Sequence, residues 1–197
     1  MNTADDGKNT KILFVNACVH RETSRTDRLA RELISRFPNA DVEELILEDS
    51  GIGPIDGKTL DMRNKSVSDN DFSNPHFNYA RQLISADIVV FASPFWESMF
   101  NTFMKAYLEN VSVPGLVFSY NEHGVPVGNA KGKLYYVTTR GGPVTDENDP
   151  GCMVMKTLAF MFGFKDFRIL SASALDIIGN DPEQILQESI SKIGSIL

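Results

Sequence analysis

Two rhythms of hydrophobic positions alternate along this chain. Short runs of consecutive apolar residues, typical of strands buried on both faces, are followed by segments in which apolar residues recur every three or four positions, as on one face of a helix. The predicted strands are residues 11–16, 41–47, 88–92, 133–138 and 167–172. The predicted helices are residues 26–37, 77–85, 99–111 and 152–162, and a last helix that opens at Asp181 and Pro182.

Strands that alternate with helices in this way predict an α/β fold, a parallel sheet with helices on both faces. We expect residues 1–197 to form a single domain, with residues 1–10 as a flexible extension. The favoured topology is a doubly wound five-stranded sheet in the order 2-1-3-4-5. Ligands of such sheets bind beyond the carboxyl ends of the strands, so the loops after the first, third and fourth strands form the candidate site.

Two segments break the pattern. Residues 48–74 are rich in Gly, Pro, Asp, Asn and Ser, and residues 114–131 separate the third predicted helix from the fourth predicted strand. Loops of this length in compact domains are usually functional or partly disordered. The sequence therefore predicts two long excursions from the α/β core.

Charge and composition narrow the class of protein. The formal net charge of −7 argues against a nucleic-acid partner and against docking on an anionic membrane, which both require a basic surface. The first residues do not resemble a signal peptide, and no apolar run is long enough to span a membrane. Cys18 and Cys152 form no CxxC pattern and the histidines no metal-binding spacing, so we expect a cytoplasmic protein without a metal.

The loop after the first strand is the first candidate binding segment. Ser24 and Asp27 have the spacing of a capping box, so one interpretation is simply a well-capped helix start. The other is a phosphate site, because a helix N-terminus offers free N–H groups and a positive dipole, to which Ser24, Arg25 and Thr26 add donors. The loop contains neither GxGxxG nor the P-loop pattern, so a dinucleotide or Walker-type site is not expected.

The loop after the third strand combines aromatic side chains with a carboxylate. It reads Pro94, Phe95, Trp96, Glu97 and Ser98. Aromatic residues usually pack in a core, but at the end of a strand they also suit a flat ring such as a flavin, which needs an apolar partner and backbone groups along its polar edge. We predict that this loop binds the ring.

The loop after the fourth strand is a turn of small residues, Thr139, Arg140, Gly141 and Gly142. One interpretation is a plain loop, since Gly-Gly marks turns of every kind. The other is that the glycines let the backbone approach a ligand closely, with Arg140 placing positive charge near the flavin N1–C2=O edge. The coincidence of three such loops at one edge of the sheet favours a bound flavin.

Together these segments resemble the flavodoxin-like NAD(P)H:quinone reductase and FMN-dependent azoreductase family. Residues 24–26 are similar to its phosphate loop, residues 93–98 stand where it has a flavin loop, and residues 139–142 resemble its [ST]-R-G-G turn. Residues 115–124 also resemble its G-x-x-F-x-Y-x-x-x-G insertion. The resemblance covers nearly the whole chain.

The resemblance implies a flavodoxin-like fold, non-covalently bound FMN and a homodimer with each active site at the subunit interface. NADH or NADPH and a small-molecule acceptor, a quinone, azo or nitro compound, would take turns on one face of the flavin in a ping-pong hydride mechanism. Chemistry would occur at FMN N5 with no catalytic side chain, and Phe118 and Tyr120 would shape the acceptor pocket. The residues assigned to FMN are Cys18, Ser24, Arg25, Thr26, Pro94, Phe95, Trp96, Glu97, Ser98, Thr139, Arg140, Gly141 and Gly142.

Two positions depart from the family pattern. Trp96 and Glu97 stand where azoreductases typically have Tyr-Asn, and a carboxylate beside the flavin would disfavour the reduced anion. Cys18 stands where Ser is frequent, and is either a small buried residue or a redox group.

Other interpretations remain. An electron-carrier flavodoxin fits the acidic charge, but the insertion at residues 114–131 argues against the open flavin edge that a carrier needs. A flavin-free binding module with the same fold would not require all three loops. Helix 152–162 is apolar nearly all round, so it is either wholly buried or half of a dimer interface. His123 either lines the acceptor pocket or is a solvated loop residue.

Overall fold

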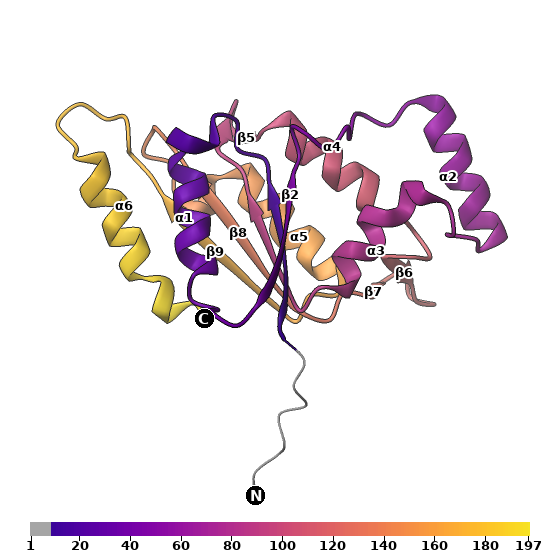
Figure 1. Cartoon of the computed structure of the whole chain (residues 1–197). Coiled ribbons are helices and arrows are strands. Elements are labelled where there is room, and N and C mark those ends of the chain that lie inside the picture. Colours follow the sequence, from indigo (N-terminus) through magenta and orange to yellow (C-terminus); the bar gives the residue numbers. More distant parts are fainter. Residues whose placement is uncertain (1–8) are drawn as a thin grey trace, which may run out of the picture.

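The computed structural model describes residues 9–197, and its core is a five-stranded parallel sheet in the order β2-β1-β3-β8-β9 (Figure 1). The strands are β1 (Lys11–Asn16), β2 (Asp41–Ile46), β3 (Ile88–Ala92), β8 (Lys133–Thr139) and β9 (Asp166–Ala172). Counted along the chain, this order is 2-1-3-4-5, so the predicted fold class is confirmed. Asn16 pairs with Ala92 and Ala92 with Val137, which brings the carboxyl ends of the three central strands level. Most of the predicted N-terminal extension lies outside the described residues.

Helices cover both faces of the sheet because its strands present apolar side chains on both. On β1, Ile12 and Phe14 belong to one buried cluster, while Leu13 and Val15 belong to another. Residues of α1 (Arg25–Ile34) and α6 (Pro182–Ser191) complete the first cluster, and residues of α3 (Asn78–Ser85), α4 (Thr102–Val111) and α5 (Pro150–Phe162) the second. The period of two along β1 therefore divides the core into two layers.

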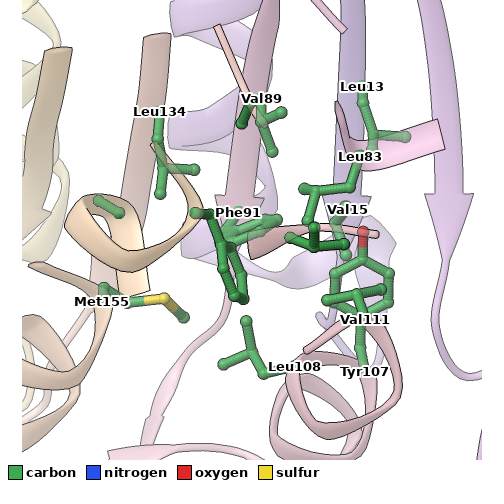
Figure 2. Close-up of a cluster of buried hydrophobic side chains, with 14 of the residues drawn as sticks. Leu13, Val15, Leu83, Val89, Phe91, Tyr107, Leu108, Val111, Leu134 and Met155 are labelled. Atoms are coloured by element: carbon green, nitrogen blue, oxygen red, sulfur yellow. The ribbon is translucent and has the colours of Figure 1, made fainter. Parts of the chain in front are cut away.

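The second cluster is the larger core layer (Figure 2). Phe91 on β3 meets Tyr107 on α4 edge to face, with ring centroids 5.8 Å apart. Leu134 on β8 and Met155 on α5 extend the same layer. Each fully buried side chain of this size stabilises the fold by roughly 1.5–3 kcal/mol relative to exposure. This packing holds β3 and β8 rigidly beneath the loops that follow them.

Residues 48–74 contain a helix that the sequence pattern does not predict. α2 (Gly57–Asp69) begins after Asp56, whose carboxylate accepts the N–H of Thr59 at 2.8 Å. None of its residues is fully buried, so the sequence lacks the apolar stripe from which a helix is normally predicted. The prediction of a single long loop was wrong over this stretch.

The third predicted helix starts later than its apolar residues suggest. Its first two residues form β5 (Met99–Phe100), which pairs antiparallel with β4 (Phe95–Trp96). Glu97 and Ser98, which connect the two strands, have φ of +46° and +66°, respectively. A type I′ hairpin turn requires positive φ at both of these positions. α4 begins only after Asn101, whose side chain caps it. Two apolar residues that precede a helix with the right spacing look like its first turn, which explains the error.

Residues 114–131 also contain regular structure. They form a hairpin of β6 (Phe118–Tyr120) and β7 (Pro126–Gly128). The hairpin docks on the end of α5, where the N–H of Ala130 donates to the carbonyl of Phe162 at 2.9 Å. A Cβ on Gly128 would lie 1.8 Å from the carbonyl carbon of Phe162, so this close approach requires glycine.

The remaining elements are short or end as expected. The 3-10 turns are η1 (Arg21–Thr23), η2 (Pro75–Phe77), η3 (Asp146–Asn148) and η4 (Ile193–Ser195). Gly163 ends α5 with φ of +89°, so the prediction of a glycine C-cap is confirmed. α6 starts after Asp181, also as predicted, but ends at Ser191, and η4 continues the apolar pattern.

Candidate functional site

The three predicted loops meet at the carboxyl edge of the sheet. They are the β1 loop (residues 17–24), the β3 loop (residues 93–101) and the β8 loop (residues 139–142). The β1 and β3 loops start side by side, since the N–H of Ala17 donates to the carbonyl of Ala92 at 2.9 Å. The hydroxyls of Thr26 and Thr139, 2.6 Å apart, join the start of α1 to the β8 loop. The sequence therefore located this edge correctly.

The β1 loop ends at the N-terminus of α1, in the geometry of an anion site. Ser24 is the N-cap, and its hydroxyl accepts the N–H of Asp27 at 3.2 Å. The N–H groups of Arg25 and Thr26 find no acceptor within residues 9–197. The two interpretations of this segment are thus compatible, because the cap leaves N–H groups that a phosphate can accept from.

The side chains of Arg25 and Thr26 already have partners. The guanidinium of Arg25 lies 2.8 Å from the carboxylate of Asp176. This pair is solvent-exposed and is worth at most about 1 kcal/mol, so a phosphate dianion can take the place of the carboxylate. The hydroxyl of Thr26 is buried against Thr139, which leaves its N–H rather than its side chain for a ligand.

Cys18 is a small, buried residue at the start of the β1 loop. Burial raises the pKa of its thiol to about 12, so the sulfur stays protonated at neutral pH. Its N–H donates to the Asn16 side-chain oxygen at 3.0 Å. A protonated, inaccessible thiol is a poor nucleophile, so the structure favours packing over a redox role for Cys18.

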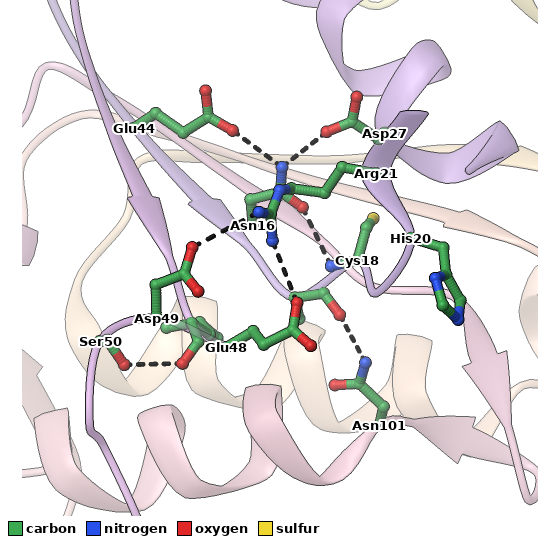
Figure 3. A network of polar contacts seen from close by, with 12 residues as sticks. Asn16, Cys18, His20, Arg21, Asp27, Glu44, Glu48, Asp49, Ser50 and Asn101 are labelled. Atoms are coloured by element: carbon green, nitrogen blue, oxygen red, sulfur yellow. Dashed lines mark hydrogen bonds and ion pairs between the residues drawn. The ribbon is translucent and has the colours of Figure 1, made fainter. Parts of the chain in front are cut away.

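A polar network that is buried at Asn16 and Asp27 supports the start of the β1 loop (Figure 3). The amide nitrogen of Asn16 donates to Asp27 at 2.6 Å and to Glu44 at 2.9 Å. Arg31 joins both carboxylates, at 2.7 Å each, and hydrogen bonding to Asp27 in particular raises the pKa of its guanidinium. The sequence reading missed this network, although an asparagine at the end of an otherwise apolar strand was a signal for it.

A polar cavity of about 410 Å³ opens beside the β1 loop. It is lined by Val19, His20, Arg21, Glu22, Thr23 and Glu48. His20 has a left-handed backbone with φ of +54°, and Arg21 is held by Glu48 at 3.1 Å. The cavity therefore leaves open space close to the N-terminus of α1.

The β3 loop is a hairpin that presents an aromatic surface. Trp96 is 50% exposed at the tip of β4, next to the turn residues Glu97 and Ser98. Pro94 starts the loop, and its carbonyl accepts the Ser93 hydroxyl at 3.3 Å. A half-exposed indole on a short, hydrogen-bonded hairpin is a suitable platform for a flat ring.

Arg140, the residue predicted to place positive charge near the flavin, has carboxylate partners within the protein. Its guanidinium is fully buried and lies 2.7 Å from Asp149 and 2.8 Å from Asp146. Burial alone would lower its pKa, but the hydrogen bonds to these two carboxylates outweigh burial and raise it. The positive charge is therefore paired with carboxylates inside the protein, and these contacts anchor the β8 loop to the residues that precede α5. The role of Arg140 at a flavin edge stays a prediction.

The two glycines of the β8 loop face different surroundings. A Cβ on Gly141 would lie 2.3 Å from the carboxylate of Asp176, so this position requires glycine for packing. A Cβ on Gly142 would have nothing within 4 Å. The backbone at Gly142 therefore borders open space, as expected where a ligand approaches the chain.

Phe118 and Tyr120 are not brought together with the three loops in this chain. Their hairpin docks at the C-terminal end of α5, whereas the N-terminal end of that helix meets Arg140 (Figure 1). Phe118 is buried and stacks on Phe162, with ring centroids 6.3 Å apart, while Tyr120 is exposed. His123, in the turn of the hairpin, is also exposed. Their role in an acceptor pocket stays a prediction.

Fold and site geometry together define a flavodoxin-like α/β protein in which a helix start with free N–H groups and a half-exposed tryptophan lie at the switch point of the sheet. The chain belongs to the family described as having the flavodoxin-like fold, whose pattern matches residues 10–197. Within residues 9–197, no helix is both long and apolar enough to cross a membrane.

Relatives with similar sequences carry consistent names. The chain is 30% identical to a protein named FMN-dependent NADH:quinone oxidoreductase 2 from Clostridium acetobutylicum, over 93% of this chain and 96% of that protein. It is also 30% identical to the FMN-dependent NADH:quinone oxidoreductase of Clostridium perfringens, over 95% of this chain and 98% of that protein.

Solved structures agree on the fold. An azoreductase from Bacillus anthracis superposes with a TM-score of 0.79 at 20% identity, covering 95% of this chain and 98% of that chain. An FMN-dependent NADH-azoreductase from the same species, solved in complex with FMN, gives a TM-score of 0.76 at 18% identity, covering 94% and 96%. At these identities the likeness establishes the fold alone.

Proposed function

We propose that this protein is an FMN-dependent oxidoreductase that takes reducing equivalents from NADH and passes them to a quinone. The observation that carries the proposal is the convergence of a free helix N-terminus, a half-exposed tryptophan and an open glycine at one edge of the sheet. The names of the relatives with similar sequences support this choice of cofactor, donor and acceptor.

The residues present fit FMN. The N–H groups of Arg25 and Thr26 and the dipole of α1 would hold the phosphate, with the Arg25 guanidinium released from Asp176. Trp96 would cover one part of the ring, and the backbone at Gly142 would lie along its edge. FMN, when bound, supplies a hydride-accepting N5, and the protein binds and orients it.

The same open surface would receive donor and acceptor in turn, which is a ping-pong order. Azo and nitro compounds join quinones as proposed acceptors, since a site without a catalytic side chain selects chiefly by shape and reduction potential. The test is initial-rate kinetics of FMN-loaded protein with NADH and menadione. Parallel lines in double-reciprocal plots are expected, and intersecting lines would contradict the proposed order.

We further propose that the enzyme is a homodimer. Met153 and Phe160 on α5 are 62% and 63% exposed, which leaves two large apolar side chains open to solvent on one helix face, beside Lys156 and Thr157. A groove of about 620 Å³ lies among α2, α4 and α5. In the proposed dimer, the hairpin of one copy, with its exposed Tyr120, would lie against the ring loops of the other. Sedimentation should give twice the monomer mass, and a Phe160→Lys variant should sediment as a monomer.

A flavodoxin-type electron carrier is the rival function. It would also bind FMN, but it would exchange electrons with protein partners and would not react with NADH alone. NADH oxidation that depends on both added FMN and a quinone would support the enzyme, while FMN binding without NADH oxidation would favour the carrier.

The proposed location of the protein is the cytoplasm, because both cysteines are free thiols.

A further inference from the structure

Asn101 connects two of the site loops through buried hydrogen bonds. Its side-chain nitrogen donates to the carbonyl of Ala17 at 2.5 Å, in the β1 loop. Its backbone N–H donates to the hydroxyl of Ser93 at 3.1 Å, which closes the base of the β3 loop. Its side-chain oxygen accepts the N–H of Met104 at 3.2 Å and so caps α4. Asn101 is 3% exposed, so water does not compete for these bonds.

The contact with Ala17 is part of a two-sided clamp on one peptide group (Figure 3). The Asn101 side chain donates to the Ala17 carbonyl, and the Asn16 side-chain oxygen accepts the N–H of Cys18 at 3.0 Å, at the opposite edge of the same peptide group. Asn16 is in turn fixed by Asp27. The plane of this peptide sets the direction in which the β1 loop leaves the sheet.

We propose that Asn101 is a positioning residue that aligns the phosphate-binding β1 loop with the ring-binding β3 loop. The inference rests on the proposed FMN function and adds to it a structural coupling between the two ends of the cofactor. The alignment strengthens the binding of a ligand that contacts both loops, and it has little effect on the binding of a ligand that contacts only the β3 loop. Asn101 would therefore stabilise binding of FMN more than binding of riboflavin, which lacks the phosphate.

The decisive variant is Asn101→Ser. Serine is as good an N-cap as asparagine, so α4 keeps its cap, but its side chain is too short to reach the Ala17 carbonyl. Asp56→Ala is the matched control, since it removes the N-cap of an exposed helix, α2, without touching either loop. Dissociation constants of FMN and riboflavin are measured by quenching of flavin fluorescence for the wild-type protein and both variants.

The expected result is a selective loss. In Asn101→Ser, FMN binding weakens roughly tenfold relative to riboflavin binding, the effect of about one buried hydrogen bond. Asp56→Ala leaves the ratio of the two constants unchanged. Equal weakening of both flavins in Asn101→Ser would overturn the inference, because it would show only a general loss of structure. Failure of the wild-type protein to bind FMN would overturn both the inference and the proposed function.

A second measurement tests the clamp without any flavin. Hydrogen–deuterium exchange of the ligand-free protein should be faster in the β1 loop of Asn101→Ser than in the wild-type protein. Exchange within α4 should stay the same, since the cap is kept. Unchanged exchange in the β1 loop would overturn the inference while leaving the proposed function intact.

Discussion

The buried ion pair of Arg140 with Asp149 should stabilise the β8 loop, and substitutions at both residues test this. The guanidinium donates from Nε to Asp149 at 2.8 Å and from Nη1 to the Ser173 hydroxyl at 3.0 Å, and it also lies beside Asp146. Asp149 is itself fully buried. Replacing Arg140 with methionine keeps most of the volume but leaves the Asp149 carboxylate without its cation. We expect the free energy of unfolding to fall by about 3–5 kcal/mol, the cost of an unpaired buried charge.

The assay is urea unfolding of the ligand-free protein, followed by far-UV circular dichroism at one fixed protein concentration. Arg28→Met is the matched control, because Arg28 pairs with Glu183 on the surface and should cost no more than about 1 kcal/mol. Asp149→Asn keeps the cap on Gly151 while it removes the charge. The double variant, Arg140→Met with Asp149→Asn, should therefore lose clearly less than the sum of the single losses.

Two results would contradict the proposed stabilising role of the Arg140–Asp149 pair. Additive losses in the double variant would show that Arg140 and Asp149 are not coupled. A stability loss in Arg140→Met as small as that in Arg28→Met, together with weaker flavin binding, would show that the charge of Arg140 acts on the ligand and not on the fold.

Three further predictions follow from single positions. Glu97→Asn should raise the free energy of unfolding by about 1 kcal/mol in urea, because asparagine tolerates the φ of +46° better; a loss would contradict the turn geometry. Gly128→Ala should lower it by about 1–3 kcal/mol, since the new Cβ collides with Phe162; a neutral result would mean that the hairpin docks elsewhere. The thiols of Cys18 and Cys152, whose pKa burial raises to about 12, stay protonated in the folded protein while the unfolded chain ionises near its ordinary pKa of 9.0. Stability should therefore be unaffected by these thiols below pH 9.0 and fall as the pH rises towards about 12, and both should resist Ellman's reagent until the protein unfolds; rapid labelling of the native protein would contradict their burial.

The sheet and the location of the site were predictable from the sequence. An uninterrupted apolar run such as residues 88–92 indicates a strand that is buried on both faces. Such strands alternate with segments of helical periodicity, and this order of elements is compatible with few topologies. The switch-point rule then placed three loops at one edge, and the hydrogen bonds there confirm their proximity. Local pattern and fold-level geometry agreed at these positions.

The elements that the sequence did not predict depend on contacts that leave no local pattern of hydrophobic and polar positions. α2 has no fully buried residue, and only Met62 and Val67 pack, partly buried, against the core, so its apolar pattern is weak. The pairing of Arg140 was not predicted, because its carboxylate partners, Asp146 in η3 and the α5 N-cap Asp149, contact it only in the folded chain. The role of Asn101 depends on the carbonyl of Ala17, which is distant in sequence. Charge neutralisation and tertiary hydrogen bonds of this kind leave no periodic signal.

The visible absorption spectrum under anaerobic conditions tests the proposed function most directly. Purified protein is loaded with FMN, freed of unbound flavin, and mixed with a slight excess of NADH, and then with menadione. We expect the absorbance of the bound flavin to bleach with NADH alone and to return when the quinone is added. Bound flavin that stays oxidised in the presence of NADH would contradict the proposed oxidoreductase function.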